Sequence, residues 1–329
     1  MEEGEEQLQL FKFRKRRFGL IEVEIYHDEV YDNKKEKLPF GHQFLIVPIY
    51  SRSFFNNILM NERKKVNAEY PSVRWHELKK ESKSRNFTAK RWLEILYGAT
   101  YNKQFGYIRN REIKFTKYPL GIKILSIFID SLDELSNSYW KDTLTPSDKR
   151  IKKYEALLRM GIQGIVHYCF NPEYTNYSKI IITRICTDGK YGSIPIDSER
   201  IIRKLEYNTR SYIGIKTRKI ECIPKSKDKT PEVNFEELTD LVLGSSRYLC
   251  GYKKRQEWKD KIVKPLKIIY DKRKRNKKGR ESSPHYRSFS ISHCSGNEDG
   301  LLHFDNYYGL KNNMEIENEL NNFQLRLGI

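Results

Sequence analysis

The chain contains several runs in which apolar residues recur with the period of a strand or of a helix. The first run reads Leu-Ile-Glu-Val-Glu-Ile-Tyr-His-Asp-Glu, and in it Ile21, Val23 and Ile25 alternate with polar residues. Successive side chains of a strand point to opposite faces of a sheet, so this alternation predicts a strand with one buried face. The strand ends in two neighbouring acids, Asp28 and Glu29, and a polar segment follows it.

Further apolar runs predict more strands, and two of them also end close to an acid. Asp130 directly follows one run, and Asp188 closely follows another. Ligands bind beyond the carboxyl ends of the strands in open α/β sheets, so acids at these ends indicate a common site. The predicted strands are His42–Tyr50, Ile122–Ile129, Ser178–Cys186 and Ile215–Ile223.

Between the strands, apolar residues recur at helical spacing. In the last of these segments Leu238, Leu241 and Val242 share one face, and Asp240 lies at the rim of that face. The alternation of strands and helices predicts an α/β fold, with a mixed sheet flanked by helices. The helices are expected at Ser51–Asn67, 86–105, Lys149–Tyr168, Ser198–Asn208 and Phe235–Cys250.

The length and composition fit one folded domain with polar ends. The hydrophobic fraction of 38% is low for 329 residues, but aromatic residues make up 13% and can fill a core. We expect the domain to span residues 20–252, an ordinary size for a single domain. Residues 1–19 would form an acidic and then basic lead, and residues 253–329 a basic arm with a polar C-terminal extension.

A net charge of +19 changes this picture, because it favours a polyanionic partner. Nucleic acid is the simplest such partner, since neutralised phosphates release counterions. More than half of the charge is local: residues 253–280 hold 14 Lys or Arg against three acids, a net charge of +11. The core of this stretch, Asp271–Arg280, cannot bury apolar area, which is typical of a mobile arm, and the basic residues would contact phosphates. The alternative is that many of the lysines only solvate the surface.

The cysteines and the N-terminus bear on the cellular compartment. Five cysteines are scattered without a Cys-x-x-Cys pair, which favours a reducing compartment and disfavours a structural zinc site. The acidic N-terminus lacks the apolar core of a secretory signal, and no apolar run has membrane-spanning length. We therefore expect a cytoplasmic protein that does not bind a membrane.

Acids that come from separate elements could together bind a divalent cation. Several carboxylates that crowd together repel one another unless a cation neutralises them. Hard oxygen ligands suit Mg²⁺ or Mn²⁺, and a pair of such ions is the usual device for hydrolysing a phosphodiester. The candidate acids are Asp28, Glu29, Glu77, Asp130, Asp188 and Asp240.

The order of these short motifs resembles that of a bacterial family catalogued as domain of unknown function 3800. The matching features are a strand that ends in Asp28 and Glu29, the pair His76 and Glu77, two further strand-end acids, and a final helix that reads Glu-Leu-Thr-Asp-Leu-Val-Leu-Gly. The chain departs from the family in two places. The family's Asp-Glu-Ser-Gly is here Asp-Glu-Val-Tyr, and Glu237 stands where the family's Gln-x-Ala-Asp-Leu has Gln.

The resemblance covers roughly residues 20–252, and it implies a ribonuclease H-like fold and a metal-dependent nuclease that acts on DNA or RNA. His76 would position a water or a phosphate. The implied metal ligands are Asp28, Glu77, Asp188 and Asp240, with Glu29 and Asp130 as auxiliary acids.

Each of these residues also has an ordinary structural interpretation. Asp130 could cap a helix, Asp240 could be an early-turn acid favoured by the helix dipole, and His76 and Glu77 could simply be exposed. For the whole protein, the alternative is a non-catalytic nucleic-acid-binding or assembly protein, with protein partners of a mobile-element or antiphage defence system. A pure binder gains nothing from gathering carboxylates near phosphates, so the acidic cluster distinguishes the two hypotheses.

Overall fold

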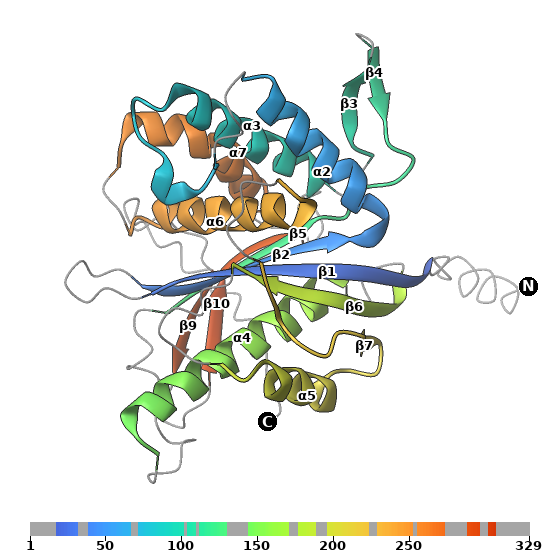
Figure 1. Ribbon diagram of the computed structural model, residues 1–329, viewed down its shortest axis with the longest axis vertical. Coiled ribbons are helices and arrows are strands. Elements are labelled where there is room, and N and C mark those ends of the chain that lie inside the picture. The colour runs from blue at the N-terminus through green and yellow to red at the C-terminus, as the bar shows by residue number, and fades with distance from the viewer. Residues whose placement is uncertain are drawn as a thin grey trace, which may run out of the picture.

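The computed structural model describes most of the chain, and in this part the predicted α/β class is confirmed: a mixed sheet has helices on both faces (Figure 1). None of the helices in this part is both long and apolar enough to cross a membrane. The described residues are 18–31, 39–66, 72–101, 104–109, 112–129, 144–170, 177–188, 196–223, 229–252, 255–273, 288–296 and 302–306.

The sheet is organised around its longest strand, β1, and the described part of it has eight strands. These are β1 (Phe18–Val30), β2 (Phe40–Pro48), β5 (Lys123–Ile129), β6 (Tyr177–Thr187), β7 (Ile213–Ile215), β8 (Glu221–Cys222), β9 (Phe289–Gly296) and β10 (Leu302–Asn306). β1 pairs antiparallel with β2 and parallel with β6, and β2 pairs antiparallel with β5. β1, β5 and β6 therefore run in the same direction and end at the same edge of the sheet.

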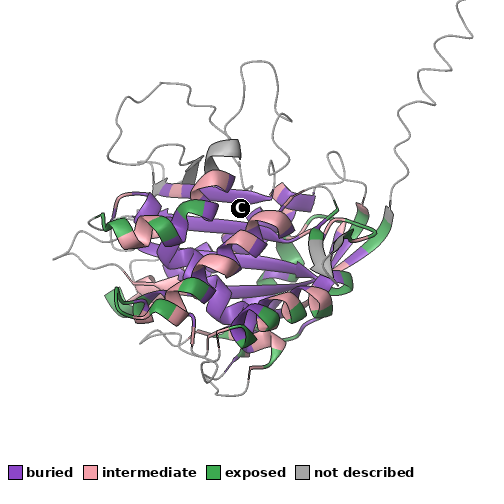
Figure 2. Cartoon of the chain, turned by 90° about the horizontal axis from the view of Figure 1, so that it is seen from above, coloured by how far each residue is buried: buried purple, intermediate pink, exposed green. Residues whose placement is uncertain are grey.

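Helices cover both faces of the sheet, and each face has its own apolar core. One core lies under α2, α3, α6 and α7, and the other lies under α4 and α5 (Figure 1). Figure 2 shows buried residues along the sheet and on the inner sides of the helices. The helix bounds are α2 (Ile49–Lys64), the short 3-10 helix η1 (Trp75–Glu77), α3 (Lys83–Ala99), α4 (Pro146–Phe170), α5 (Ser198–Asn208), α6 (Pro231–Leu249) and α7 (Glu257–Arg273).

Two parts of the fold differ from the strands predicted in the sequence. The run Ile215–Ile223 was predicted as one strand, but it contributes the end of β7 and the two-residue strand β8, both parallel to β6. A two-stranded antiparallel ribbon between α3 and β5 was not predicted at all. It consists of β3 (Gly106–Arg109) and β4 (Glu112–Phe115).

The C-terminal part of the chain belongs to the same fold. α7 packs against α3 and α6, β9 pairs parallel with β5, and β10 pairs antiparallel with β9. Residues that we expected in a basic arm and a polar extension thus add a helix to one layer and two strands to the sheet. The most basic stretch of the predicted arm, residues 274–280, lies outside the described residues.

Candidate functional site

Two of the predicted strand-end acids lie on neighbouring strands. Asp28 and Glu29 are near the end of β1, and Asp188 directly follows β6. β1 and β6 are paired in parallel up to His27 and Thr187. The acids that follow therefore lie side by side at the carboxyl ends of these two strands. This is the arrangement that the sequence predicted for these residues.

Helix α6 adds two more acids at the same place. Glu236 and Asp240 are four residues apart, so they share one face of the helix. The carboxyl groups of Asp240 and Asp28 lie close enough to act on each other's pKa, which places this part of α6 beside the end of β1. We refer to Asp28, Glu29, Asp188, Glu236 and Asp240 as the carboxylate cluster.

Glu236 is the member of the carboxylate cluster that sequence reasoning missed. The residue is only 1% exposed, and neither of its carboxylate oxygens has a hydrogen-bond partner. The charges that act on it include those of Asp188, Glu29 and Asp240. A buried carboxylate of this kind is costly unless it holds a proton or a cation.

Burial is the main cause of raised carboxyl pKa values in the cluster, and mutual repulsion adds to it. Burial, followed by the charges of Asp240 and Glu29, raises the pKa of Asp28 well above its usual range. Burial and Asp188 raise the pKa of Glu29 to about 8, and they raise the pKa of Glu236 well above its usual range. Glu29 therefore holds a proton near neutral pH, and a cation bound beside it would displace that proton.

Arg74 brings a positive charge to the carboxylate cluster. The residue is buried, and its Nη1 lies 3.7 Å from Oδ2 of Asp188. Its charge also counters the rise in the pKa of Glu236 and of Asp240. The separation from Asp188 is longer than a hydrogen bond, so the guanidinium is not locked onto that carboxylate.

The segment that carries Arg74 is fixed to α6 by two backbone hydrogen bonds. The amide of Val73 donates to Oε2 of Glu237 at 3.1 Å, and the amide of Trp75 donates to Oδ2 of Asp240. Asp240 thus both joins the carboxylate cluster and holds the chain that approaches it. This strap, residues 72–78, positions Arg74 beside the acids.

Glu237 is part of a buried ion-pair network. It stands where the motif Gln-x-Ala-Asp-Leu of the domain of unknown function 3800 family has Gln. It pairs with Arg63, and its Oε1 accepts a hydrogen bond from Nζ of Lys229 at 2.8 Å. The guanidinium of Arg63 in turn lies over the ring of Trp92, 4.5 Å from its centre. Glu237 therefore has a structural role, although it is adjacent to Glu236 in the sequence.

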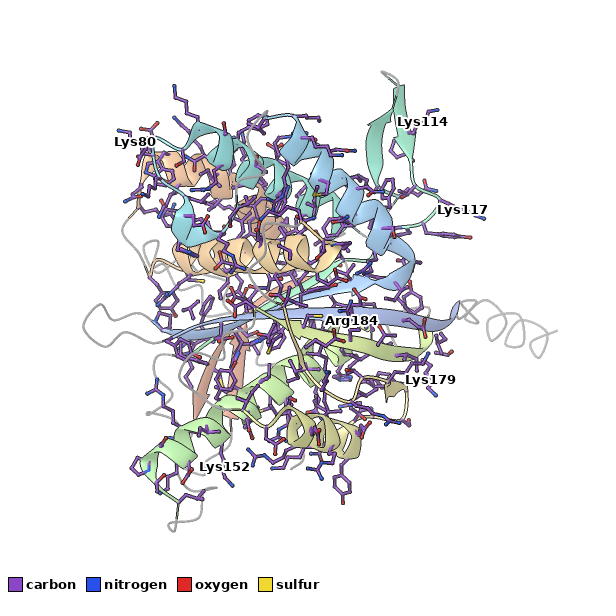
Figure 3. All side chains as sticks on the ribbon, in the orientation of Figure 1. Lys80, Lys114, Lys117, Lys152, Lys179 and Arg184 are labelled. Atoms are coloured by element: carbon purple, nitrogen blue, oxygen red, sulfur yellow. The ribbon has the colours of Figure 1, made fainter. Side chains whose placement is uncertain are left out.

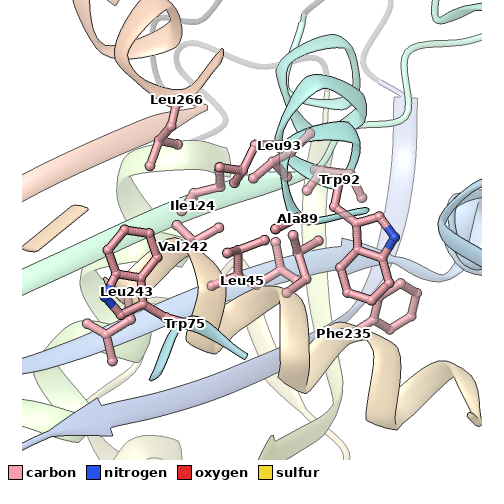
Figure 4. Close-up of a cluster of buried hydrophobic side chains, with 14 of the residues drawn as sticks. Leu45, Trp75, Ala89, Trp92, Leu93, Ile124, Phe235, Val242, Leu243 and Leu266 are labelled. Atoms are coloured by element: carbon pink, nitrogen blue, oxygen red, sulfur yellow. The ribbon is translucent and has the colours of Figure 1, made fainter. Parts of the chain in front are cut away.

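The strap also depends on the absence of a side chain at Gly244. Trp75 packs against α6 beside Val242 and Leu243 (Figure 4), and a Cβ at position 244 would lie 1.9 Å from its Cγ. We expect Gly244→Ala to displace Trp75 and to lower the free energy of unfolding by about 1–3 kcal/mol, as overpacking does. Thermal unfolding followed by circular dichroism measures this loss.

Gly164→Ala is the matched control for Gly244→Ala. Gly164 also lies inside a helix, α4, but a Cβ there would meet nothing within 4 Å. Alanine is favoured over glycine in helices, so this variant should be slightly more stable than the wild type. Equal changes in stability in the two variants would contradict the proposed close contact at Trp75.

His76 and Glu77 lie at the solvent-facing rim of the carboxylate cluster. The His76 side chain is 60% exposed, with Nδ1 4.0 Å from Oδ1 of Asp240 and Nε2 3.8 Å from Oε1 of Glu77. The other oxygen of Glu77, Oε2, is 3.6 Å from Nη2 of Arg85. Glu77 thus lies between His76 and Arg85. We predicted it as a metal ligand, and the structure places it at the rim of the carboxylate cluster.

In the described ranges, no group of three or more His, Cys, Asp or Glu side chains has the arrangement of a formed metal site. The predicted Mg²⁺ or Mn²⁺ therefore stays a prediction. Of the predicted ligands, the structure brings together Asp28, Glu29, Asp188 and Asp240, places Glu77 at the rim, and does not describe Asp130, although β5 ends at the same edge.

No protein-family model matches the chain, and no match was found among curated proteins or solved structures. The resemblance to the domain of unknown function 3800 family therefore stays a prediction from the sequence motifs.

Proposed function

We propose that the carboxylate cluster binds Mg²⁺ or Mn²⁺ and that the protein is a metal-dependent nuclease, which hydrolyses phosphodiester bonds of DNA or RNA. The observation that carries the proposal is Glu236, whose two buried carboxylate oxygens have no hydrogen-bond partner. An unsatisfied buried polar group costs about 1–3 kcal/mol, and more when it is charged. A divalent cation satisfies such oxygens directly, and these two cations prefer carboxylate ligands.

The strand order supports a ribonuclease H-like fold as part of this proposal. The order β5-β2-β1-β6-β7 places three antiparallel strands beside two strands that are parallel to β1. A ribonuclease H-like sheet is expected to have this arrangement of strands. The acids of the cluster come from the central strand, from the neighbouring parallel strand and from α6, the helix that follows the last of these strands.

The carboxylate cluster offers only hard oxygen donors, which suit such a cation, although within the described residues no three of these side chains are arranged as a formed metal site. A bound divalent cation supplies charge stabilisation for a phosphate and lowers the pKa of its bound water. The residues that would hold it are Asp28, Asp188, Glu236 and Asp240, with Glu29 beside them.

Two residues outside the carboxylate cluster have roles in the proposed reaction. Arg74 is placed to bind a phosphate oxygen, since the fork of guanidinium N–H groups matches phosphate geometry. His76 reaches from solvent to Asp240, so its ring nitrogens are placed to accept a proton from the site and pass it to solvent.

The proposal is tested by metal titration and by cleavage. Calorimetry in metal-free buffer should show Mg²⁺ or Mn²⁺ binding to the wild type, and labelled DNA and RNA should be cleaved only when the cation is present. Asp28→Asn should bind the cation poorly and cleave at least about a hundredfold more slowly, since metal-dependent charge stabilisation is lost. The variant should fold normally, because the raised pKa of Asp28 already favours its neutral form.

Two outcomes would contradict the proposal. Undiminished cleavage by Asp28→Asn would remove the carboxylate cluster as the active site. A wild type that binds nucleic acid but neither binds a cation nor cleaves would favour the alternative, a non-catalytic nucleic-acid-binding protein.

A further inference from the structure

The β3–β4 ribbon projects from the body of the protein and has no place in the carboxylate cluster. In Figure 1 it stands at the upper right, beside α2, whereas the carboxyl end of β1 lies at the left of the sheet. The ribbon pairs Gly106 with Phe115 and Arg109 with Glu112, and it forms a sheet of its own. A projecting ribbon of this kind offers two faces to a partner.

The root of the ribbon is firmly attached to the domain. Phe105 is buried beside Gly98 of α3, and its ring meets that of Phe54 at 6.2 Å between centres. Phe105 and Thr116 exchange two hydrogen bonds: the Phe105 amide donates to Thr116 Oγ1 at 2.8 Å, and the Thr116 amide donates to Phe105 O at 3.0 Å. On the other side, Tyr50 Oη donates to Pro119 O at 2.9 Å. The base of the ribbon is therefore anchored to the domain.

Aromatic rings with high exposure gather on and beside the ribbon. Phe115 is 64% exposed, Tyr118 is 51% exposed and Tyr50 is 52% exposed. The ring of Phe115 lies over Gly106, the residue it pairs with. Burying rings of this size normally contributes to stability, and leaving them in water is a cost that a partner would remove.

The same segment of the chain is rich in basic residues. Residues 103–117 contain five Lys or Arg and a single acid, Glu112. Nζ of Lys117 lies 5.3 Å from the centre of the Tyr118 ring, and Lys114 is also exposed (Figure 3). Exposed rings interleaved with lysines match the two parts of a nucleotide, because a base stacks on a ring and its phosphate meets a cation.

We propose that the β3–β4 ribbon is a second nucleic-acid contact, which holds a single-stranded segment by stacking bases on Phe115 and Tyr118 while Lys114 and Lys117 contact its phosphates. Single-stranded nucleic acid is favoured over a duplex because the base faces of a duplex are already stacked on one another, whereas those of a single strand are available. The inference shares with the proposed function only its nucleic-acid partner. Binding at the ribbon requires neither the carboxylate cluster nor a cation.

The test is fluorescence anisotropy of the full chain with a labelled oligonucleotide, in EDTA so that no metal-dependent cleavage occurs. A single strand of about 20 thymidines should bind the variant with Phe115→Ala and Tyr118→Ala about tenfold or more weakly, since each stacked base contributes to affinity. The variant with Phe115→Tyr and Tyr118→Phe keeps both rings and should bind as the wild type does. Lys114→Ala with Lys117→Ala should lower the slope of log K against log salt by about 1.4, the value for two phosphate contacts on a single strand.

A matched control separates the ribbon from exposed aromatic residues in general. Phe87 is 49% exposed and Tyr207 is 89% exposed, and both lie on helices away from the ribbon. Alanine at these two positions should leave binding unchanged. Failure of the wild type to bind the single strand, unchanged binding by the Phe115 and Tyr118 alanine variant, or an equal loss for the matching duplex would overturn the inference. None of these results depends on whether the protein cleaves nucleic acid.

Discussion

Glu236→Gln is expected to make the metal-free protein more stable and to abolish its stabilisation by Mg²⁺ or Mn²⁺. Glutamine has nearly the same shape as glutamate but carries no charge, so it removes the repulsion from Asp188, Glu29 and Asp240. We expect a higher free energy of unfolding in EDTA, because the amide carries no charge to desolvate; each unit by which burial raises a carboxyl pKa corresponds to about 1.4 kcal/mol. In the wild type, a cation at a hundred times its Kd should add about 2.7 kcal/mol, and the variant should lose most of this increment.

The pH dependence of this gain follows from the pKa of Glu236. Burial raises this pKa in the folded protein above the unfolded value of 4.5. A raised carboxyl pKa means that the folded state binds the proton more tightly than the unfolded state does. The destabilisation caused by Glu236 is therefore absent below pH 4.5 and grows as the pH rises towards the folded pKa. The difference in stability between Glu236→Gln and the wild type should therefore widen between pH 4 and neutral pH, as thermal unfolding in EDTA would show.

Glu206→Gln provides the control for this comparison. Glu206 lies exposed on α5, on the opposite face of the sheet from α6, and the same change of charge there should alter neither the stability nor the response to cations. If Mg²⁺ raised the melting temperature of Glu236→Gln as much as that of the wild type, Glu236 would not be a ligand.

Glu237→Ala is expected to lower the stability strongly, although the residue is next to Glu236. It would remove the buried ion pairs that Arg63 and Lys229 make with this carboxylate, and the acceptor of the Val73 amide. Removing one partner of a buried ion pair typically costs about 3–5 kcal/mol. Urea unfolding at neutral pH measures this loss.

The corresponding surface variant is Glu257→Ala. Glu257 pairs with Lys261 at 2.7 Å in the first turn of α7, but both side chains are mostly exposed. Exposed ion pairs contribute little, so we expect no measurable change in stability. A loss in Glu237→Ala as small as that in Glu257→Ala would show that the buried network does not stabilise the strap.

The parts of the fold with regular apolar spacing could be predicted from the sequence. Ile21, Val23 and Ile25 are buried as their alternation predicted, and the runs that form β2, β5 and β6 were also identified. These strands are central in the sheet, so packing on their faces imposes a clear pattern. The edge elements carry weaker signals, because they have fewer buried neighbours to satisfy.

Helix α7 was not predicted, because its sequence is rich in charged residues. Ile262, Val263, Leu266 and Ile269 form a buried stripe at helical spacing, but they are embedded in a run of lysines that led us to predict a basic arm outside the domain. β9 was overlooked for a similar reason, since serines alternate with its buried apolar residues. In both segments the apolar face was narrow, and the average composition was polar.

The sequence indicated the acids at the strand ends, Asp240 on α6, and His76 and Glu77 in the strap, but not Glu236 or Arg74. Asp28 and Asp188 could be placed together because the ends of parallel strands meet at one edge. Glu236 could have been found from its four-residue spacing to Asp240. The positions of Arg74 and Glu77 depend on backbone hydrogen bonds of the strap, which leave no pattern in the sequence.

The pairing of β9 with β5 has a consequence for biosynthesis. Phe289 lies opposite Ile124, so β5 gains its outer neighbour only after most of the chain has left the ribosome. Until then a strand that is buried along its whole length in the native protein presents open backbone groups at an edge. A nascent chain, or one shortened to end at residue 252, would therefore offer a template for pairing with other polypeptides, and a chaperone that shields β5 would aid its maturation.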